Sequence, residues 1–238
     1  MKALALLGPL LLVAACGAGS DADQITVFAA SSLTKPFTQL AQMYEQEHPG
    51  TEVVLNFAGS ADLVAQLDQG APASVLATAD EATMHRAQAS TELSDTAFAT
   101  NAMTIVVPKG NPGGVTSLSD LARPELNVVV CAPQVPCGVA TSRIETSAGI
   151  SIAADSEESA VADVLGKVSS GQADAGIVYV SDSATAADKV SAVPIPDSVN
   201  TTNVYLIAAL SGQGQQFADF VLSDQGQQVL ADDGFGPP

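Results

Sequence analysis

The sequence is poor in cations and in residues that usually carry catalysis. It has 8 Lys and Arg against 26 Asp and Glu, a formal net charge of −18. Nucleic acid and anionic membrane surfaces attract cationic proteins, so neither is an expected partner. Only two histidines occur, His48 and His85, and no His, Cys and carboxylate cluster has metal-ligand spacing. A bare metal cation is therefore not an expected ligand.

A serine hydrolase is also a poor match, because the sequence has few histidines that could serve as its base. Its nucleophile needs a neighbouring base, and the motif G-x-S-x-G, which marks a nucleophile elbow, is absent. We therefore expect a protein that is not an enzyme, and keep an exported serine hydrolase as an alternative.

Long apolar runs are also scarce, and the one near the N-terminus covers about 13 residues, too few to span a bilayer. It is typical of a signal peptide, here predicted at residues 1–15. The small residues before Cys16 resemble a bacterial lipobox, which implies cleavage before Cys16 and a lipid on its thiol. A plain secretory signal is the alternative. Residues 16–23 are predicted to be a flexible tether. We expect an exported protein, lipid-anchored to the outer face of the bacterial cell membrane.

The two remaining cysteines, Cys131 and Cys137, flank a short segment that contains prolines. In an oxidising exterior, such a close pair is predicted to form a disulfide. Free thiols are the alternative, and a metal site is disfavoured because no further ligand lies near in sequence.

Short apolar runs rich in β-branched residues alternate with helical patterns, which is typical of an α/β protein with a mostly parallel sheet. We expect strands at 25–30, 52–57, 74–78, 103–108, 127–131, 173–179 and 204–210. We expect helices at 33–48, 60–69, 117–122, 138–147, 157–170 and within 212–232. Glu157 and Glu158 are interpreted as acidic residues that stabilise the start of their helix.

Strands and helices alternate in two blocks, one before about residue 102 and one after it, and a final strand and helices follow. This order predicts two lobes joined by two crossings of the chain. We place residues 24–102 together with 205–238 in the first lobe and residues 103–204 in the second. A ligand in the cleft between the lobes would close them about a hinge.

Serines follow two of the expected strands directly. Ser32 ends the segment ITVFAASS, and Ser60 follows Gly59 after the next strand. The first-turn N–H groups of a helix have no partner inside it, and its dipole is positive there, so both positions favour an anion. Ordinary helix capping by the two serines is the alternative interpretation.

Five segments in this order resemble the extracytoplasmic molybdate-binding proteins of molybdate ABC transporters: ITVFAASSLT, GAPA, ATAD, VPCG and GIVYVSD. The resemblance covers nearly the whole chain after the tether. It implies the fold of a type II periplasmic binding protein, with two α/β lobes and the oxyanion between them.

Carried over residue by residue, the resemblance implies a dianion held by hydrogen bonds alone. Ser32 and Ser60 would each give a hydroxyl and a backbone N–H. Cys137 and Val161 would give backbone N–H groups, Val161 being placed by its spacing before Tyr179. Tyr179 would give its phenol O–H, although half-buried packing is the common role of such a tyrosine. A deprotonated oxyanion only accepts hydrogen bonds, so all these groups should be donors.

The implied function is a monomeric receptor that binds molybdate, and also tungstate, and delivers it to an ABC permease without a cofactor. Another tetrahedral oxyanion such as sulfate is the alternative ligand. The sequence departs from the family at Gly59, where a serine run is frequent, and at Cys137, where a small residue such as alanine is common.

Overall fold

The structure is a computed structural model that describes residues 23–238. The predicted signal peptide, the lipidation site at Cys16 and residues 16–22 of the tether lie outside the described residues. The tether prediction is wrong at its last residue. Asp23 opens the first strand, where its backbone N–H donates to the carbonyl of Gly50 at 3.1 Å. No helix within residues 23–238 is long and apolar enough to cross a membrane.

Strands and helices alternate along most of the described chain. The strands are β1 (Asp23–Ala30), β2 (Thr51–Ala58), β3 (Val75–Thr78), β4 (Asp95–Pro108), β5 (Val128–Cys131), β6 (Ala154–Glu158), β7 (Ala175–Tyr179), β8 (Val190–Pro194) and β9 (Thr202–Ala209). The α-helices are α1 (Thr34–Glu47), α2 (Ser60–Asp68), α3 (Glu81–Gln88), α4 (Pro136–Ala148), α5 (Val161–Ser169), α6 (Val180–Thr185), α7 (Gly212–Leu222) and α8 (Asp224–Asp232). Two 3-10 turns are η1 (Ser31–Leu33) and η2 (Leu118–Ala122).

The strands pair in the order β2-β1-β3-β9-β4-β7-β5-β6, and β8 pairs with β4. Strands β2, β1 and β3 are parallel to one another, as are β6, β5 and β7. Between these two sets, β9 and β4 run antiparallel to their neighbours. The predicted α/β class is confirmed, and the sheet is mixed because the connecting strands run in both directions.

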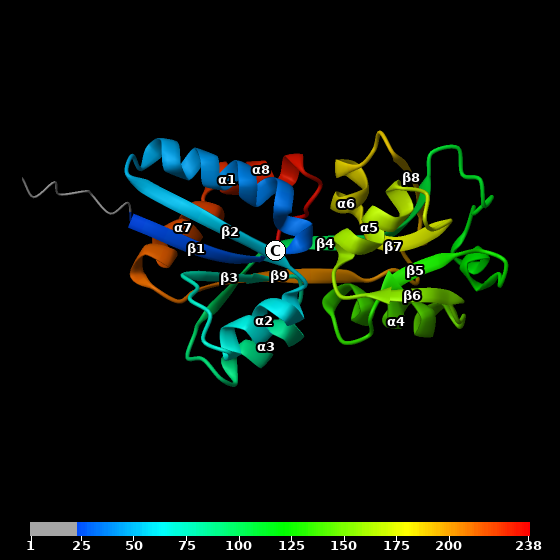
Figure 1. Cartoon of the computed structure of the whole chain (residues 1–238), viewed down its shortest axis with the longest axis horizontal. Helices are drawn as coiled ribbons and strands as arrows, with labels where there is room; N and C mark the ends of the chain where they lie inside the picture. The colour runs from blue at the N-terminus through cyan, green and yellow to red at the C-terminus, as the bar shows by residue number, and fades with distance from the viewer. Residues whose placement is uncertain (1–22) are drawn as a thin grey trace, which may run out of the picture.

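Strand β4 belongs to both halves of the molecule that Figure 1 shows side by side. Its first part pairs with β9 from Asp95 to Ala102, and from Met103 onward it pairs with β7. The sequence predicts only the second of these parts. The chain therefore passes from one half to the other within a single strand, between Ala102 and Met103.

The first half has helices on both faces of its strands. Helix α1 buries Phe37, Leu40 and Tyr44, at steps of three and four residues, against the sheet and α7. On the opposite face, α2 and α3 bury Leu63 and Met84 against the other side of the same strands. Figure 1 shows these two layers above and below the sheet. Each such large apolar side chain contributes about 1.5–3 kcal/mol when fully buried.

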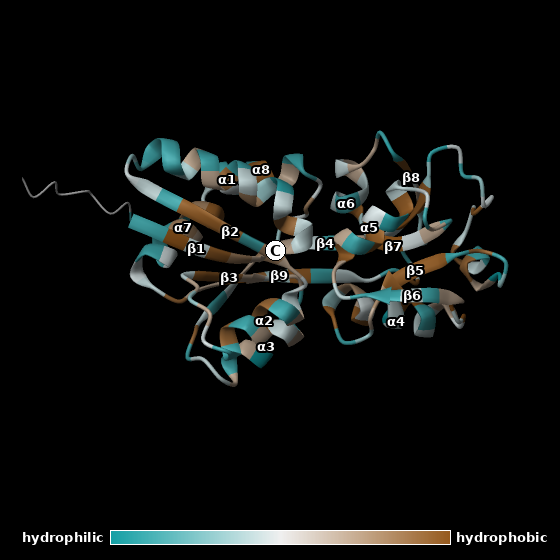
Figure 2. Ribbon diagram, in the orientation of Figure 1, coloured by the Kyte–Doolittle hydropathy of each residue, from teal (hydrophilic) through white to brown (hydrophobic). Residues whose placement is uncertain are grey.

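The second half follows the same plan with shorter elements. Every residue of β5 and β7 is buried, and helices α4 and α5 pack against both strands. Figure 2 shows β5 and β7 as largely hydrophobic and the neighbouring β6 as hydrophilic. The core of this half therefore lies on its inner strands, with β6 at the edge of the sheet.

The helix predicted at 157–170 is wrong at its start. Glu157 and Glu158 lie in β6, and α5 begins at Val161. Glu158 instead accepts a hydrogen bond from the ammonium of Lys167, which lowers the pKa of its carboxyl. An edge strand buries little surface, so its sequence lacks the apolar pattern by which strands are predicted.

Candidate functional site

A small cavity, partly open to solvent, lies where the two halves meet. Residues from both halves line it, and they come from the ends of strands and the starts of helices. They are Ala30, Ser31, Ser32, Gly59, Ser60, Ala79, Val135, Pro136, Cys137, Ser159, Ala160, Val161 and Tyr179. No lining residue carries a charge, so the cavity is an uncharged site in a strongly acidic protein.

Helix starts surround the cavity, and four of them have no side-chain cap. The residues that precede η1, α2, α4 and α5 are Ala30, Gly59, Val135 and Ala160, and none makes a side-chain capping hydrogen bond. All four line the cavity. None of these residue types carries a side-chain acceptor, so first-turn N–H groups at these starts are left for another acceptor.

Helices away from the cavity are capped in the ordinary way. Asp80, Ser211 and Ser223 accept from first-turn N–H groups of α3, α7 and α8. Ser32 and Ser60 do not act in this way, because Ser32 lies inside η1 and Ser60 is the first residue of α2. The capping interpretation of these two serines is therefore wrong.

The structure brings all five predicted ligand residues to this cavity. Ser32, Ser60 and Tyr179 are buried there, at 6%, 2% and 1% exposure, although each carries a hydroxyl. Cys137 is the second residue of α4, and Val161 is the first residue of α5, so their N–H groups belong to first turns. That these five residues bind a ligand stays a prediction.

Each of the three hydroxyl groups has a partner behind it. Ser60 Oγ accepts from the backbone N–H of Ala79 at 3.1 Å. Tyr179 Oη accepts from Nδ2 of Asn203 at 2.9 Å. Ser32 Oγ lies 2.9 Å from the hydroxyl of Tyr205, and either oxygen can be the donor. These contacts fix the hydroxyl oxygens in place.

A buried polar layer lies behind the cavity, and sequence reasoning assigned it no role. Burial raises the pKa of the Tyr179 and Tyr205 hydroxyls well above the ordinary value, so both remain protonated donors at neutral pH. Burial also raises the pKa of Asp182 to about 7, against the opposing hydrogen bond from the N–H of Tyr179. Asp182 ends the segment GIVYVSD, and this was the one available signal for it in the sequence.

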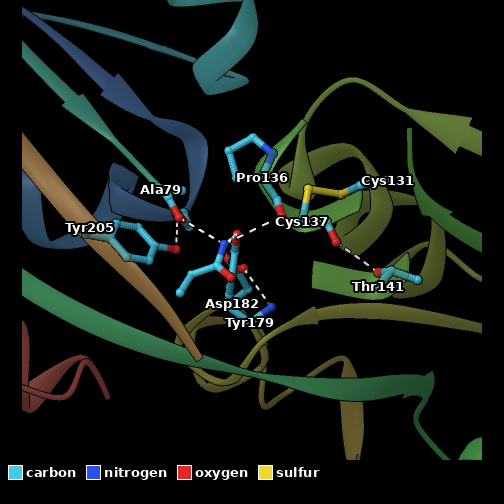
Figure 3. The surroundings of a disulfide bond; sticks show 10 residues. Ala79, Cys131, Pro136, Cys137, Thr141, Tyr179, Asp182 and Tyr205 are labelled. Carbon is cyan, nitrogen blue, oxygen red and sulfur yellow. Dashed lines mark hydrogen bonds between the residues drawn. A yellow bond between two sulfur atoms is a disulfide. The ribbon is translucent and has the colours of Figure 1, made fainter. Parts of the chain in front are cut away.

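Cys131 and Cys137 form a disulfide in the structure, with their Cα atoms 5.6 Å apart. It links the end of β5 to the first turn of α4, beside the cavity, as Figure 3 shows. The carbonyl of Cys137 accepts from Thr141 Oγ1 at 2.9 Å inside the same helix. A Cβ at Gly138 would lie 1.8 Å from the carbonyl oxygen of Ala132, so only glycine lets α4 begin this close to the preceding loop.

The cavity lacks the groups that a hydrolase or a cation site would need. Neither His48 nor His85 lines it, so no imidazole stands beside Ser32 or Ser60 to act as a base. His48 instead stacks on Tyr44 with ring centroids 4.0 Å apart. Among residues 23–238 no group of His, Cys, Asp and Glu is placed to hold a metal ion. The lining can donate hydrogen bonds to an anion, and its residues include no carboxylate and no imidazole.

A family model described as a bacterial extracellular solute-binding protein matches residues 25–236. The chain belongs to this family. Among its relatives is the molybdate-binding protein ModA of Mycobacterium bovis, 46% identical over 241 residues that cover 94% of this chain and 92% of the relative.

Solved structures of similar fold include a molybdate-binding protein and a sulfate-binding protein. The periplasmic molybdate-binding protein of Azotobacter vinelandii matches with a TM-score of 0.78 at 21% identity, over 90% of this chain and 99% of that one. The sulfate-binding protein SubI of Mycobacterium tuberculosis H37Rv matches with a TM-score of 0.74 at 18% identity, over 90% and 87% of the two chains. At these identities the matches confirm the predicted fold.

Proposed function

We propose that this solute-binding protein captures molybdate and delivers it to the permease of an ABC importer. The observation that carries the proposal is the uncharged cavity at which four uncapped helix starts and three buried hydroxyls meet. A fully deprotonated tetrahedral dianion accepts hydrogen bonds and donates none, which is the chemistry complementary to this lining. The identity of 46% to a molybdate-binding protein supports molybdate among such anions.

In this proposal five residues hold the ion. Ser32 and Ser60 give hydroxyl and backbone donors from the first half of the molecule. Cys137 and Val161 give backbone N–H groups from the second half, and Tyr179 gives its phenol O–H. Distant surface carboxylates oppose the binding only weakly, because salt attenuates their field beyond about 8 Å at physiological ionic strength.

Selection among tetrahedral dianions would depend on the size of the donor shell. Molybdate and tungstate have longer bonds to oxygen than sulfate does, so a shell that fits them leaves sulfate unable to reach every donor. Unmade buried hydrogen bonds are costly, which disfavours the smaller ion. We therefore propose tungstate as a second ligand and keep sulfate as the alternative, since SubI has the same fold.

The proposed receptor has two lobes that close about the strands β4 and β9. We place the first crossing between Ala102 and Met103, where β4 changes partners. The second is placed just before Thr202, where β9 begins, in place of the boundary between 204 and 205 that the sequence suggested. The protein would act as a monomer outside the cell membrane, anchored by lipid at Cys16 and presenting the closed form to its permease. Mass spectrometry of membrane-extracted protein would detect the lipid, and an unmodified Cys16 in it would contradict the anchor.

Thermal unfolding with molybdate, tungstate, sulfate and phosphate, each added separately, tests the ligand. A ligand present at about a thousand times its dissociation constant should add about 4 kcal/mol to the unfolding free energy. We expect a large rise in melting temperature with molybdate and tungstate only. A rise with sulfate or phosphate instead would change the ligand, and no response to any of them would contradict an oxyanion receptor.

Removal of single hydroxyls tests the donor set. Ser60→Ala and Tyr179→Phe should each weaken molybdate binding by about 1–3 kcal/mol, because each removes a hydrogen bond to a charged group. Calorimetric titration would measure the loss. Ser142→Ala, which changes an exposed serine of α4 outside the cavity, is the matched control and should bind like the wild type. Wild-type affinity in both cavity variants would contradict the donor assignment.

A further inference from the structure

Strand β9 presents two polar side chains to the layer directly behind the cavity. Asn203 and Tyr205 are two residues apart, so they lie on the same face of the strand. They are 5% and 0% exposed, and neither is among the residues that line the cavity. Each makes a hydrogen bond to a hydroxyl that does line it, so this strand face contacts the cavity through those two hydroxyls.

The amide of Asn203 has a fixed orientation. Its Nδ2 lies 2.9 Å from the carbonyl oxygen of Ala79 and 3.5 Å from that of Pro136. Carbonyl oxygens only accept, so the NH₂ end of the amide must face them. Ala79 belongs to the first half of the molecule and Pro136 begins α4 in the second, and Figure 3 shows them on opposite sides of the Tyr179 ring.

This orientation decides where the proton of Tyr179 goes. The same Nδ2 donates to Tyr179 Oη at 2.9 Å. The phenol oxygen therefore accepts from behind, and its own O–H remains free to donate elsewhere. Because Tyr179 lines the cavity, an anion bound there can accept that proton, in competition with the neighbouring hydroxyl of Tyr205.

Tyr205 contacts the hydroxyl of Ser32 from behind, as Asn203 contacts that of Tyr179. Its hydroxyl is completely buried and lies 2.9 Å from Ser32 Oγ, with the side chains of Asn101 and Tyr179 as its other neighbours. In the arrangement inferred below, Tyr205 donates to Ser32 and leaves the Ser32 proton for the cavity. Ser60 repeats the pattern, because its Oγ accepts from the backbone N–H of Ala79.

We propose that Asn203 and Tyr205 are positioning residues that turn the hydroxyl protons of Tyr179 and Ser32 toward the bound anion. This inference rests on the proposed function. The two residues do not touch the ligand. They occupy the acceptor sites of both hydroxyls, so that the cavity offers donors already oriented before the dianion arrives. Less reorganisation then opposes binding, as preorganisation requires.

A double-mutant cycle on Tyr205 and Ser32 tests this role with calorimetric titration of molybdate. Tyr205→Phe should weaken binding about tenfold, because Ser32 loses the donor that orients it. In a Ser32→Ala background the same change should have almost no effect on the dissociation constant, because the group through which Tyr205 acts is gone. A role in packing alone would instead give the same loss in both backgrounds.

A second cycle applies the same logic to the amide. Asn203→Leu should weaken binding in the presence of Tyr179 and much less in a Tyr179→Phe background. Thermal melts of the ligand-free variants establish that each one folds. Tyr44→Phe removes the hydroxyl of a buried tyrosine in α1 that does not line the cavity, and it should bind like the wild type.

The outcomes separate the two proposals. Losses that depend on the background support the positioning role. Wild-type affinity in Tyr205→Phe and Asn203→Leu, or losses that simply add, would overturn this inference and leave the receptor intact. No molybdate binding by the wild type would overturn the proposed function, and this inference with it.

Discussion

Replacing Asp182 with asparagine is expected to make the protein more stable than the wild type near neutral pH and above. Burial raises the pKa of this carboxyl from 3.8 to about 7, against the opposing hydrogen bond from the N–H of Tyr179. A raised pKa means that the folded state holds the proton more tightly than the unfolded chain. The stability it gives is complete below the unfolded pKa and is lost as the pH rises through the folded pKa.

The size of the effect follows from the same linkage. One pKa unit corresponds to about 1.4 kcal/mol, so the wild type should lose on the order of 4 kcal/mol from this group between about pH 4 and about pH 7. Asparagine at 182 cannot ionise, and its side-chain oxygen can still accept from Tyr179. The difference in unfolding free energy between variant and wild type should therefore grow with pH over this window and then level off.

Urea unfolding of both proteins at a series of pH values measures this difference. Glu158, whose pKa the hydrogen bond from Lys167 lowers, gives the opposite trend, but it is present in both proteins and cancels. Asp197→Asn, at an exposed position without a hydrogen bond among the described residues, is the control and should follow the wild type. Curves for Asp182→Asn and wild type that stay parallel from acid to neutral pH would contradict the assignment.

The cavity could be predicted in outline because its signals are local. A strand that ends directly in a serine and a helix is visible in the sequence at Ser32 and Ser60. The carboxyl ends of parallel neighbours such as β1 and β2 meet at one edge, which brings the two serines together. The order of motifs along the chain then predicts Cys137 and Tyr179, and the spacing before Tyr179 predicts Val161. The structure places all three at the same cavity.

The layer behind the cavity could not be predicted in this way. Asn203 and Tyr205 reach Tyr179 and Ser32 because β9 lies between β3 and β4, and no local pattern encodes that position. The first part of β4, rich in alanine and polar residues, has weak strand propensity and forms through its pairing with β9. Helix α6 was missed because it follows Tyr179 without a loop. Tertiary pairing decides these features.

A single methyl group added at Gly59 should weaken the binding of molybdate. The residue lies between β2 and α2 at the cavity, with φ −59° and ψ 138°, which any residue can adopt. A Cβ there would lie 2.1 Å from the backbone carbonyl oxygen of Ser159, in the other half of the molecule. The sequence alone showed only a missing hydroxyl at this position, whereas the structure shows a close approach of the two halves.

Gly59→Ala should therefore hold the two halves apart while leaving each of them folded. Forcing an extra methyl into a packed contact costs about 1–3 kcal/mol, which corresponds to about fivefold to about 150-fold weaker binding of molybdate. The ligand-free variant should melt close to the wild type, because its backbone is unstrained. Small-angle scattering with saturating molybdate should give a larger radius of gyration for the variant than for the wild type.

Gly166→Ala is the matched control for this experiment. Gly166 lies inside α5, where an added Cβ meets nothing within 4 Å, so the change should leave binding intact and stabilise the helix by about 0.5–1 kcal/mol. If Gly59→Ala bound molybdate as tightly as Gly166→Ala does, the contact with Ser159 could not belong to the bound state. The cavity would then have to close around its ligand with the halves further apart than they stand here.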